Sequence, residues 1–434
     1  MKIKITFKFL FFTLLFITCF SFVFATSTPS INSKAAVVMD ADSSVVLYNK
    51  EMNKKIYPAS TTKIITAILA IENLSLDKNV VVSKSAIQIP WDSSSVYLKE
   101  GEIISINDLL YCLLLNSGND AANVLAEAVS GDISAFVDLM NTKAKELGCT
   151  GTHFNNAHGY SDDNHYTTAL DMAKIFSYCI QNETFTKIIS TKSYIVDKTN
   201  KTNDKRYLSN TNRLILQKED SVYARFYEYC IGGKTGYTDE AGRTLVTFGK
   251  KDDKTVIVAV FGASSSGSQD IRYTDAINLF EYSFNNFSKK TIAEAENYSF
   301  NYINIDKKLN YTVGLKDSVE IMVDNSSSLD FSYTINIDET NLVNLDETIF
   351  TEVPAGTITF NFEDSKGNMY STSQTLYLKE ITKYNVITSA NIITIATISL
   401  AAIIVLLLII FIIFKSKNKT ALTNTSRKDR RKHK

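Results

Sequence analysis

One apolar stretch near the C-terminus restricts what this chain can fold into more than any other feature. No charged side chain occurs from Ile392 to Phe414, and a helix of these 23 residues would be about 35 Å long, enough to cross a bilayer. Nine lysines and arginines follow against one aspartate, and the positive-inside rule keeps such a segment in the cytoplasm. We therefore expect a transmembrane helix in membrane lipid at residues 391–414 and a basic cytoplasmic tail at residues 415–434. RNA binding is the alternative for the tail, but its position beside the apolar stretch favours topology.

The first 25 residues have the pattern of a removed signal peptide. Lysines precede an apolar run from Phe9 to Phe24, and Ala25 supplies a small residue for cleavage. An uncleaved membrane anchor is the alternative, because the run is fairly long. In either case the following chain is exported, so we expect a single-pass protein of the cell membrane with residues 26–390 outside the cytoplasm.

Charge is distributed unevenly along the chain. The formal net charge is zero, but the basic ends leave about −11 on residues 26–414, of which −9 falls on residues 291–390. A nucleic-acid partner calls for the opposite sign, so none is expected for the body of the protein.

Cysteine and histidine spacings point to neither a metal nor a cofactor. No C-x-x-C pair or H-E-x-x-H string occurs, and we expect no zinc site. The exported part holds four cysteines, which could form disulfides or remain buried free thiols. These are Cys112, Cys149, Cys179 and Cys230.

Hydrophobic periodicity predicts an α+β domain over residues 26–290. Strand patterns at 36–39, 45–48, 243–249 and 255–262 predict an antiparallel sheet, the first two as a hairpin. Helical patterns at 133–147 and 268–287, with capping boxes at Ser105 and Thr168, predict a helical layer on it. With 45% hydrophobic residues in 434, the chain can bury a sizeable core.

The pattern of hydrophobic residues changes after residue 290. Short alternating runs at 318–323, 331–337, 357–362 and 369–378 predict a small acidic β domain over residues 291–390. It contains no histidine or cysteine. We expect a spacer or docking role for it, with a purely structural pedestal as the alternative.

The first chemical motif is Ser60-Thr61-Thr62-Lys63, directly after Pro58-Ala59. Spacing of i, i+3 puts the Ser60 hydroxyl and the Lys63 ammonium on one helical face. A desolvated lysine has a lowered pKa and can remove the serine proton without a histidine. Alone the motif is weak, because the same spacing usually lies on a solvated helix face.

Two further motifs place polar groups where a cleft could use them. Ser117-Gly118-Asn119 follows an apolar helix in a turn, where the bland interpretation is helix capping. Lys234-Thr235-Gly236 offers a cation and a hydroxyl to a carboxylate on a strand edge, and Gly236 allows close backbone approach. By itself this could be a turn.

The order of the motifs carries the argument. Ser-x-Asn follows Ser-x-x-Lys by 57 residues, and Lys-Thr-Gly follows by another 117. With their flanks at 58–63, 116–122 and 234–238, they resemble the low-molecular-weight penicillin-binding proteins, the S11-like serine D-alanyl-D-alanine carboxypeptidases. Segments 156–160, 165–168 and 171–173 are also similar to this family. The resemblance covers residues 35–287, and less specifically the β region.

The resemblance implies the serine transpeptidase fold that penicillin-binding proteins share with β-lactamases, and it implies a carboxypeptidase activity. The enzyme would remove the terminal D-alanine from peptidoglycan stem peptides through an acyl-enzyme and would be acylated by β-lactam antibiotics. It implies no cofactor. Two departures stand out: Tyr160 replaces a common leucine, and a full membrane span replaces an amphipathic anchor.

It also implies a role for each site residue. Ser60 is the nucleophile and Lys63 its base. Ser117 helps to pass the proton to the leaving amine, and Asn119 holds the substrate amide and Lys63. At Lys234-Thr235-Gly236 the lysine and threonine bind the terminal carboxylate, and the backbone N–H groups of Ser60 and Tyr237 form the oxyanion hole.

Three competing functions remain as alternatives. A β-lactamase would share the acylation machinery, but no E-x-x-L-N string lies between Asn119 and Lys234. A non-catalytic penicillin-binding sensor of the cell wall would require that Ser60 fails to acylate. A Ser-His-Asp hydrolase is weaker still, because residues 262–267 miss the G-x-S-x-G spacing and His158 and His165 suit structural roles.

Overall fold

The computed structural model describes residues 28–266, 269–325, 331–343, 353–363, 369–383 and 397–411. Contacts divide the chain into two compact units, one dominated by residues up to 297 and the other containing residues 298–316 and 375–434. The predicted signal peptide and basic tail lie outside the described residues, as do 391–396 and 412–414 of the predicted span. The domain boundaries therefore stay predictions.

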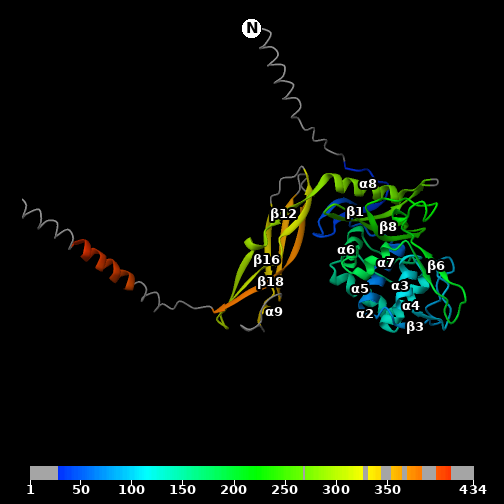
Figure 1. Cartoon of the computed structure of the whole chain (residues 1–434), viewed down its shortest axis with the longest axis horizontal. Helices are drawn as coiled ribbons and strands as arrows, with labels where there is room; N and C mark the ends of the chain where they lie inside the picture. Colours follow the sequence, from blue (N-terminus) through cyan, green and yellow to red (C-terminus); the bar gives the residue numbers. More distant parts are fainter. Residues whose placement is uncertain are drawn as a thin grey trace, which may run out of the picture. The chain divides into compact units, whose positions relative to one another are not determined.

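A five-stranded antiparallel sheet forms the centre of the first unit, in the order β2-β1-β9-β8-β7 (Figure 1). The predicted hairpin is confirmed, because β1 and β2 pair with Val38 opposite Tyr48. The strands are β1 (Ala35–Asp40), β2 (Val46–Lys50), β7 (Cys230–Thr238), β8 (Gly242–Lys251) and β9 (Lys254–Ala263).

Helices cover both faces of this sheet. α8 (Ile271–Asn286) packs on one face, and α6 (Ala169–Ile180) packs against β9 and β1 on the other (Figure 1). Burial on both faces explains why β9 is a continuous apolar run, fully buried from Val256 to Val260, and not an alternating one.

A helical layer surrounds one central helix, α2 (Lys63–Asn73). Every α2 residue from Lys63 to Ala70 is buried, because neighbouring helices pack around it. The sequence pattern explains this burial, since the segment is apolar on all sides apart from Lys63 and Thr66. The other helices of the layer are α3 (Ile106–Leu114), α4 (Asn119–Ser130), α5 (Ile133–Glu146) and α7 (Glu183–Ser190).

Local capping explains where several helices begin. The Ser105 and Thr168 side chains accept hydrogen bonds from the backbone N–H groups three residues on, as the sequence predicted. Short strand pairs and two 3-10 turns complete the unit. They are β3 (Asn79–Val81) with β4 (Ile103–Ser105), β5 (Ser193–Val196) with β6 (Arg206–Ser209), β10 (Ser265–Ser266) with β11 (Gln269–Asp270), η1 (Ala59–Thr62) and η2 (Arg213–Ile215).

Between α8 and residue 383, the described residues are mostly in strands, in agreement with the alternating sequence pattern. β12 (Phe287–Ala293) pairs with β15 (Val319–Asp324). A second five-stranded sheet has the order β13-β14-β18-β17-β16. Its members are β13 (Ser299–Asn304), β14 (Leu309–Leu315), β16 (Phe331–Ile337), β17 (Pro354–Glu363) and β18 (Met369–Lys383), with η3 (Ala295–Asn297) and a short α9 (Glu339–Val343) between strands.

Two further expectations can be compared with the structure. The four cysteines of the first unit are buried free thiols, which selects one of the two alternatives left open by the sequence. Residues 397–411 are helical. In the described parts of the chain, no helix combines the length and the apolar character needed to cross a membrane.

Candidate active site

Ser60 lies in the tight turn η1 that leads into the buried helix α2. The residue before it, Ala59, has a φ of +49°, an unusual conformation for a residue with a Cβ. Thr61 Oγ1 donates to the Pro58 carbonyl, 2.7 Å away, and fixes the turn. This strained turn directs the Ser60 side chain into a cavity.

Lys63, one turn further along, is fully buried and contacts three oxygens. Its Nζ lies 2.9 Å from Ser60 Oγ, 2.6 Å from Asn119 Oδ1 and 2.7 Å from the His158 carbonyl. The last two atoms can only accept hydrogen bonds, whereas a serine hydroxyl can also donate. A neutral amine therefore uses its two N–H groups on Asn119 and His158 and keeps its lone pair for the Ser60 hydroxyl.

Electrostatics favour that neutral amine. Burial lowers the pKa of Lys63 well below its ordinary value, and the positive charge of Lys234 acts in the same direction against Asp120. The arrangement is thus a serine paired with a lysine that can accept its proton. Burial also lowers the pKa of His158 and of His165 to about 3, so both imidazoles are neutral at physiological pH.

The Ser-x-Asn segment forms the turn between α3 and α4. Ser117 has a φ of +63° and lines the cavity, and Asn119 opens α4 with its side chain on Lys63. The next residue, Asp120, is almost fully buried. Its carboxylate accepts hydrogen bonds from the Val96 and Leu98 backbone N–H groups, at 3.1 and 3.0 Å.

Strand β7 forms the opposite wall of the cavity. A Cβ atom at Gly236 would lie 2.8 Å from the Ser60 backbone nitrogen and 2.5 Å from Thr244 Oγ1, so only glycine lets the strand approach the nucleophile this closely. Tyr237 follows at the cavity edge, 56% exposed. Thr235 Oγ1 lies 2.7 Å from Thr211 Oγ1.

Lys234 lies behind this wall and not in the cavity. Its side chain is fully buried and Nζ donates to the Thr235 carbonyl, 2.9 Å away. Burial, and then the positive charge of Arg272, lowers the pKa of Lys234 to about 7. Its charge at neutral pH is therefore sensitive to any anion that enters the cavity.

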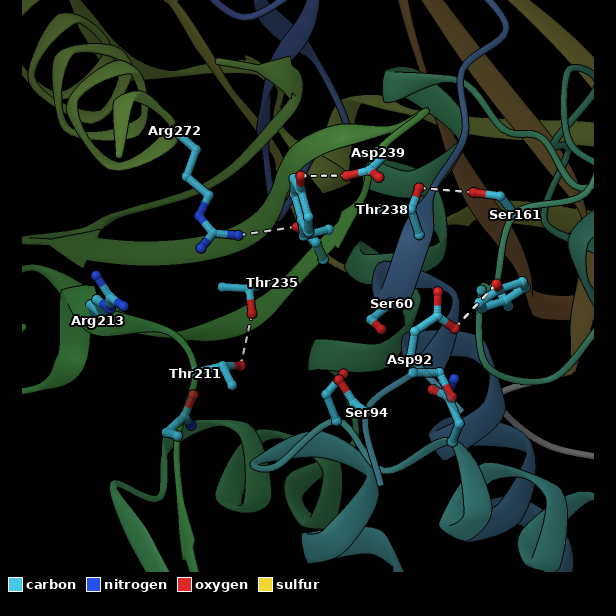
Figure 2. Close-up of a pocket in the computed structure, with 18 of the residues that line it drawn as sticks. Ser60, Asp92, Ser94, Ser161, Thr211, Arg213, Thr235, Thr238, Asp239 and Arg272 are labelled. Atoms are coloured by element: carbon cyan, nitrogen blue, oxygen red, sulfur yellow. Dashed lines mark hydrogen bonds between the residues drawn. The ribbon is translucent and has the colours of Figure 1, made fainter. Parts of the chain in front are cut away.

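The cavity encloses about 730 Å³ and joins the three motifs (Figure 2). Six of the eight predicted site residues line it, namely Ser60, Ser117, Asn119, Thr235, Gly236 and Tyr237. The two lysines lie behind its walls. Among the residues that the structure describes, no group of three histidine, cysteine or acidic side chains is placed to hold a metal.

Three contributors to this site were missed by sequence reasoning. The His158 group that holds Lys63 is a backbone carbonyl, which no side-chain pattern can reveal. Asp120 directly follows the Ser-x-Asn motif and was assigned no role. Arg272 lines the cavity from α8, and its Nη1 donates to the Gly236 and Thr244 carbonyls at 3.1 and 3.2 Å.

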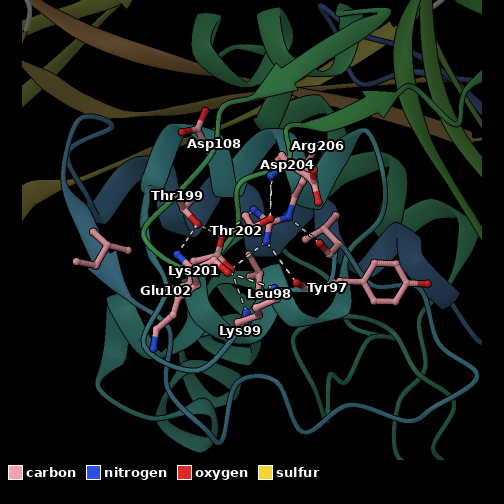
Figure 3. Close-up of polar contacts among 12 residues, drawn as sticks. Tyr97, Leu98, Lys99, Glu102, Asp108, Thr199, Lys201, Thr202, Asp204 and Arg206 are labelled. Atoms are coloured by element: carbon pink, nitrogen blue, oxygen red, sulfur yellow. Dashed lines mark hydrogen bonds and ion pairs between the residues drawn. The ribbon is translucent and has the colours of Figure 1, made fainter.

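An ion pair between Arg206 and the buried carboxylate of Glu102 is shown in Figure 3. It holds the loop at residues 92–98, part of which forms another wall of the cavity. Both guanidinium nitrogens of Arg206 contact Glu102, at 2.7 and 2.9 Å, and Arg206 Nε donates to the Val96 carbonyl. The loop thus lies between this pair and Asp120, and it places Asp92, Ser93 and Ser94 in the cavity wall. Burial alone would raise the pKa of Glu102, but hydrogen bonds led by that from Arg206 hold it below its ordinary value.

Comparison with known proteins identifies close likenesses over this unit. Residues 22–265 match the family model described as D-alanyl-D-alanine carboxypeptidase. The chain is 36% identical over 260 residues to D-alanyl-D-alanine carboxypeptidase DacF of Bacillus subtilis, a match that covers 58% of this chain and 63% of DacF. It is 32% identical over 273 residues to a D-alanyl-D-alanine carboxypeptidase of Streptomyces, covering 60% and 90% of the two chains. The match thus spans less than two thirds of DacF but most of the Streptomyces protein.

Solved structures agree with these sequence matches. The Streptomyces K15 DD-transpeptidase superposes with a TM-score of 0.54 at 31% identity, over 60% of this chain and all of that one. Penicillin-binding protein 5 of Haemophilus influenzae, at 24% identity, shares the fold with a TM-score of 0.62 over 83% of this chain and 100% of that one. The first unit therefore has the α+β fold of the penicillin-binding DD-peptidases.

Removing the guanidinium of the buried ion pair should destabilise the protein. Arg206→Met leaves the Glu102 carboxylate buried without its cation, and we expect the free energy of unfolding to fall by about 3–5 kcal/mol at pH 7. The deficit should shrink as the pH falls below about 4, because Glu102 stabilises the folded state only while it is ionised.

Denaturant unfolding followed by circular dichroism measures this effect. Lys205→Met is the matched control, since the Lys205–Asp197 pair is exposed and solvent screens it, so its loss should change the free energy of unfolding far less. Equal losses in the two variants would contradict the assigned role of Arg206.

Proposed function

Because the chain belongs to the S11 family of D-alanyl-D-alanine carboxypeptidases, we propose that it removes the terminal D-alanine from peptidoglycan stem peptides. The observation that carries this proposal is the contact of the buried Lys63 amine with Ser60 Oγ, at 2.9 Å. A serine with its own desolvated base on a cavity wall is the arrangement that an acyl-transfer enzyme without histidine requires.

The proposed first step is attack on the substrate. Lys63 Nζ takes the Ser60 proton as Oγ bonds to the carbonyl carbon between the two D-alanines. The oxygen of that carbonyl gains the negative charge, which the backbone N–H groups of Ser60 and Tyr237 stabilise. Close approach of β7 at Gly236 supports this pairing of N–H groups from two elements.

The second step breaks the peptide bond. The proton held by Lys63 passes to the leaving nitrogen, with Ser117 as the hydroxyl that relays it, and D-alanine departs. Water then attacks the ester on Ser60 and gives a proton to Lys63, which passes it to Ser60 Oγ as the shortened peptide is released. A β-lactam would acylate Ser60 by the same first step, with its ring amide as the bond that opens.

Asn119 and β7 orient the substrate in this proposal. The Asn119 side chain bridges Lys63 and the cavity, where its amide N–H groups can hold the peptide backbone. The Thr235 hydroxyl, with the charge of Lys234 behind it, attracts the terminal carboxylate. A carboxypeptidase needs this cation because its substrate ends immediately after the bond that is cut.

Two substitutions test the assigned catalytic pair. Ser60→Ala should abolish both D-alanine release from a peptide ending in D-Ala-D-Ala and labelling by a fluorescent penicillin. Lys63→Ala should lower the acylation rate by roughly 100-fold or more, because the general base is lost. An unchanged rate in Lys63→Ala would exclude Lys63 as the base. Labelling of the wild type without D-alanine release would contradict the proposed carboxypeptidase activity.

The lowered pKa of Lys234 predicts a pH-dependent affinity for carboxylates. With a pKa of about 7, Lys234 loses its charge as the pH rises through neutrality, whereas a bound carboxylate favours the charged form. The KM of a peptide with a free terminal carboxylate should therefore rise between pH 7 and 9, by up to roughly tenfold per pH unit.

A peptide that ends in D-alaninamide is the control, because it carries no charge for Lys234 to recognise. Its KM should change less over the same pH range, and effects of Lys63 ionisation cancel in the ratio of the two. Parallel profiles for acid and amide would contradict a role of the Lys234 charge in binding.

We also propose that residues 391–414 anchor the enzyme in the membrane, with a removed signal peptide at residues 1–25 and residues 291–390 as a spacer outside the cytoplasm. Support comes from the uncharged stretch at 392–414 and the basic residues after it.

Cell fractionation tests the anchor. The full chain should be released from membranes only by detergent, and a fluorescent protein fused after Lys434 should mature in the cytoplasm. Deletion of residues 391–434 should give a soluble exported protein. Recovery of the full chain in the soluble fraction would contradict the anchor.

A further inference from the structure

Strand β7 carries one N–H group of the proposed oxyanion hole, although it lies at the edge of its sheet. Among the described strands, β8 is its one neighbour in that sheet. Backbone pairing holds an edge strand from one side, so side-chain contacts have to fix the other. Thr235 Oγ1 lies 2.7 Å from Thr211 Oγ1, and Thr238 Oγ1 lies 2.8 Å from Ser161 Oγ. These two contacts with segments outside the sheet enclose the oxyanion-hole residue Tyr237.

The Ser161 hydroxyl also contacts the turn that follows β7. Its Oγ lies 2.7 Å from Glu240 Oε2, and the Ala241 N–H donates to Thr238 Oγ1 at 3.1 Å. A carboxylate only accepts, so Ser161 gives its proton to Glu240 and accepts that of Thr238. The contact with Ser161 keeps the pKa of Glu240 below its ordinary value, so the carboxylate is ionised at neutral pH. A chain of hydrogen bonds that ends at a charge is stronger than an isolated neutral bond.

Ser161 belongs to the same turn that contacts the catalytic pair. Two residues earlier, Gly159 packs against the Ala59 carbonyl so closely that a Cβ would lie 1.8 Å from its oxygen. One residue before that, the His158 carbonyl accepts from the Nζ atom of the proposed base at 2.7 Å. The turn is thus fixed to the nucleophile segment at one end and bonded to β7 at the other. Figure 2 shows the resulting bridge from Ser161 to Thr238.

An oxyanion hole works only if its two N–H groups are correctly spaced, to within about 0.5 Å. The charge that they stabilise is present in the tetrahedral intermediate and absent from the bound substrate. A displacement of about 1 Å can lower the rate by roughly 100-fold. Loss of a contact that fixes β7 should therefore slow both chemical steps, whereas the affinity for the uncharged carbonyl group should change little.

We propose that Ser161 is a positioning residue, which holds the Tyr237 backbone N–H at the distance from Ser60 that the tetrahedral intermediate requires. This inference rests on the proposed carboxypeptidase function. Ser161 acts through Thr238 and the end of β7, and it needs no contact with the reacting atoms. The order of the motifs could not indicate this role, because Ser161 lies outside all three of them.

The effect should appear in kcat and leave KM unchanged. In Ser161→Ala, kcat for D-alanine release from a peptide ending in D-Ala-D-Ala should fall by roughly 10-fold, less than after outright loss of an oxyanion donor. KM should stay within about twofold, because acylation and deacylation both pass through an oxyanion and slow together. A boronic acid analogue of the peptide, which forms a tetrahedral adduct on Ser60, should lose affinity by the same factor as kcat. The shortened product peptide should bind as it does to the wild type, which also shows that the variant is folded.

Three further variants identify the contact that matters. Ser161→Thr keeps the hydroxyl and should restore kcat to within about twofold of the wild type. Ser85→Ala is the matched control, since Ser85 also donates to a glutamate, Glu127 Oε1 at 2.7 Å, but lies outside the cavity lining. Its kcat should equal that of the wild type. In a Thr238→Val background, Ser161→Ala should lower kcat by less than about twofold, because the two side chains act as one contact.

The outcomes separate this inference from the function on which it rests. An unchanged kcat in Ser161→Ala, or a full further loss in the Thr238→Val background, would overturn the role of Ser161. Equal losses of affinity for the boronic acid and for the product peptide would also overturn it, because they indicate general damage to the fold. In each case D-alanine release by the wild type upholds the carboxypeptidase. A wild type that releases no D-alanine would overturn both.

Discussion

The burial of a single amine governs the chemistry of this protein. Lys63 lies in the first turn of a helix that other helices enclose, and its side chain has no solvent-exposed surface. Desolvation is what makes a lysine a usable base near neutral pH, because an exposed ammonium holds its proton too strongly. Burial of an amine is costly unless its N–H groups are satisfied, and the Asn119 side chain and the His158 carbonyl meet that requirement.

Close approach of separate segments makes this arrangement possible. Gly159 has a φ of +88°, and a Cβ there would lie 1.8 Å from the Ala59 carbonyl oxygen, so the His158 turn packs directly on the nucleophile turn. Gly236 does the same for β7 from the other side. The two glycines thus bring the start of α2, the His158 turn and β7 together around Ser60. Asp120 and the Glu102–Arg206 pair hold the loop that carries Asp92, Ser93 and Ser94 in the cavity wall.

The sequence predicts the main helices, strands and motifs of this protein for physical reasons, and the same reasons explain which contacts it could not predict. Apolar periodicity locates helices such as α5, and a run of β-branched and aromatic residues locates β9, because burial dictates both patterns. The order of the three motifs identifies the cavity residues, but it gives only their residue types and their spacing in the sequence, not their contacts. Contributions that depend on tertiary contact leave no such pattern: the His158 group is a backbone carbonyl, and the role of Arg272 depends on its contact with Gly236 of β7. Burial of Lys234 behind Thr235 was equally invisible, because Lys-Thr-Gly reads the same whether the lysine faces a cavity or the interior.

The position of β7 at the end of the five-stranded sheet has a consequence for substrate geometry. An edge strand presents a row of backbone N–H and C=O groups without a partner strand, which is normally a liability for aggregation. Here that row borders the cavity, next to the nucleophile. An extended peptide can complete the ladder as a temporary sixth strand, so its main chain is aligned before any side chain is read. A substrate bound in this way would give the sheet its sixth strand on entry, and the sheet would lose that strand again when the product leaves.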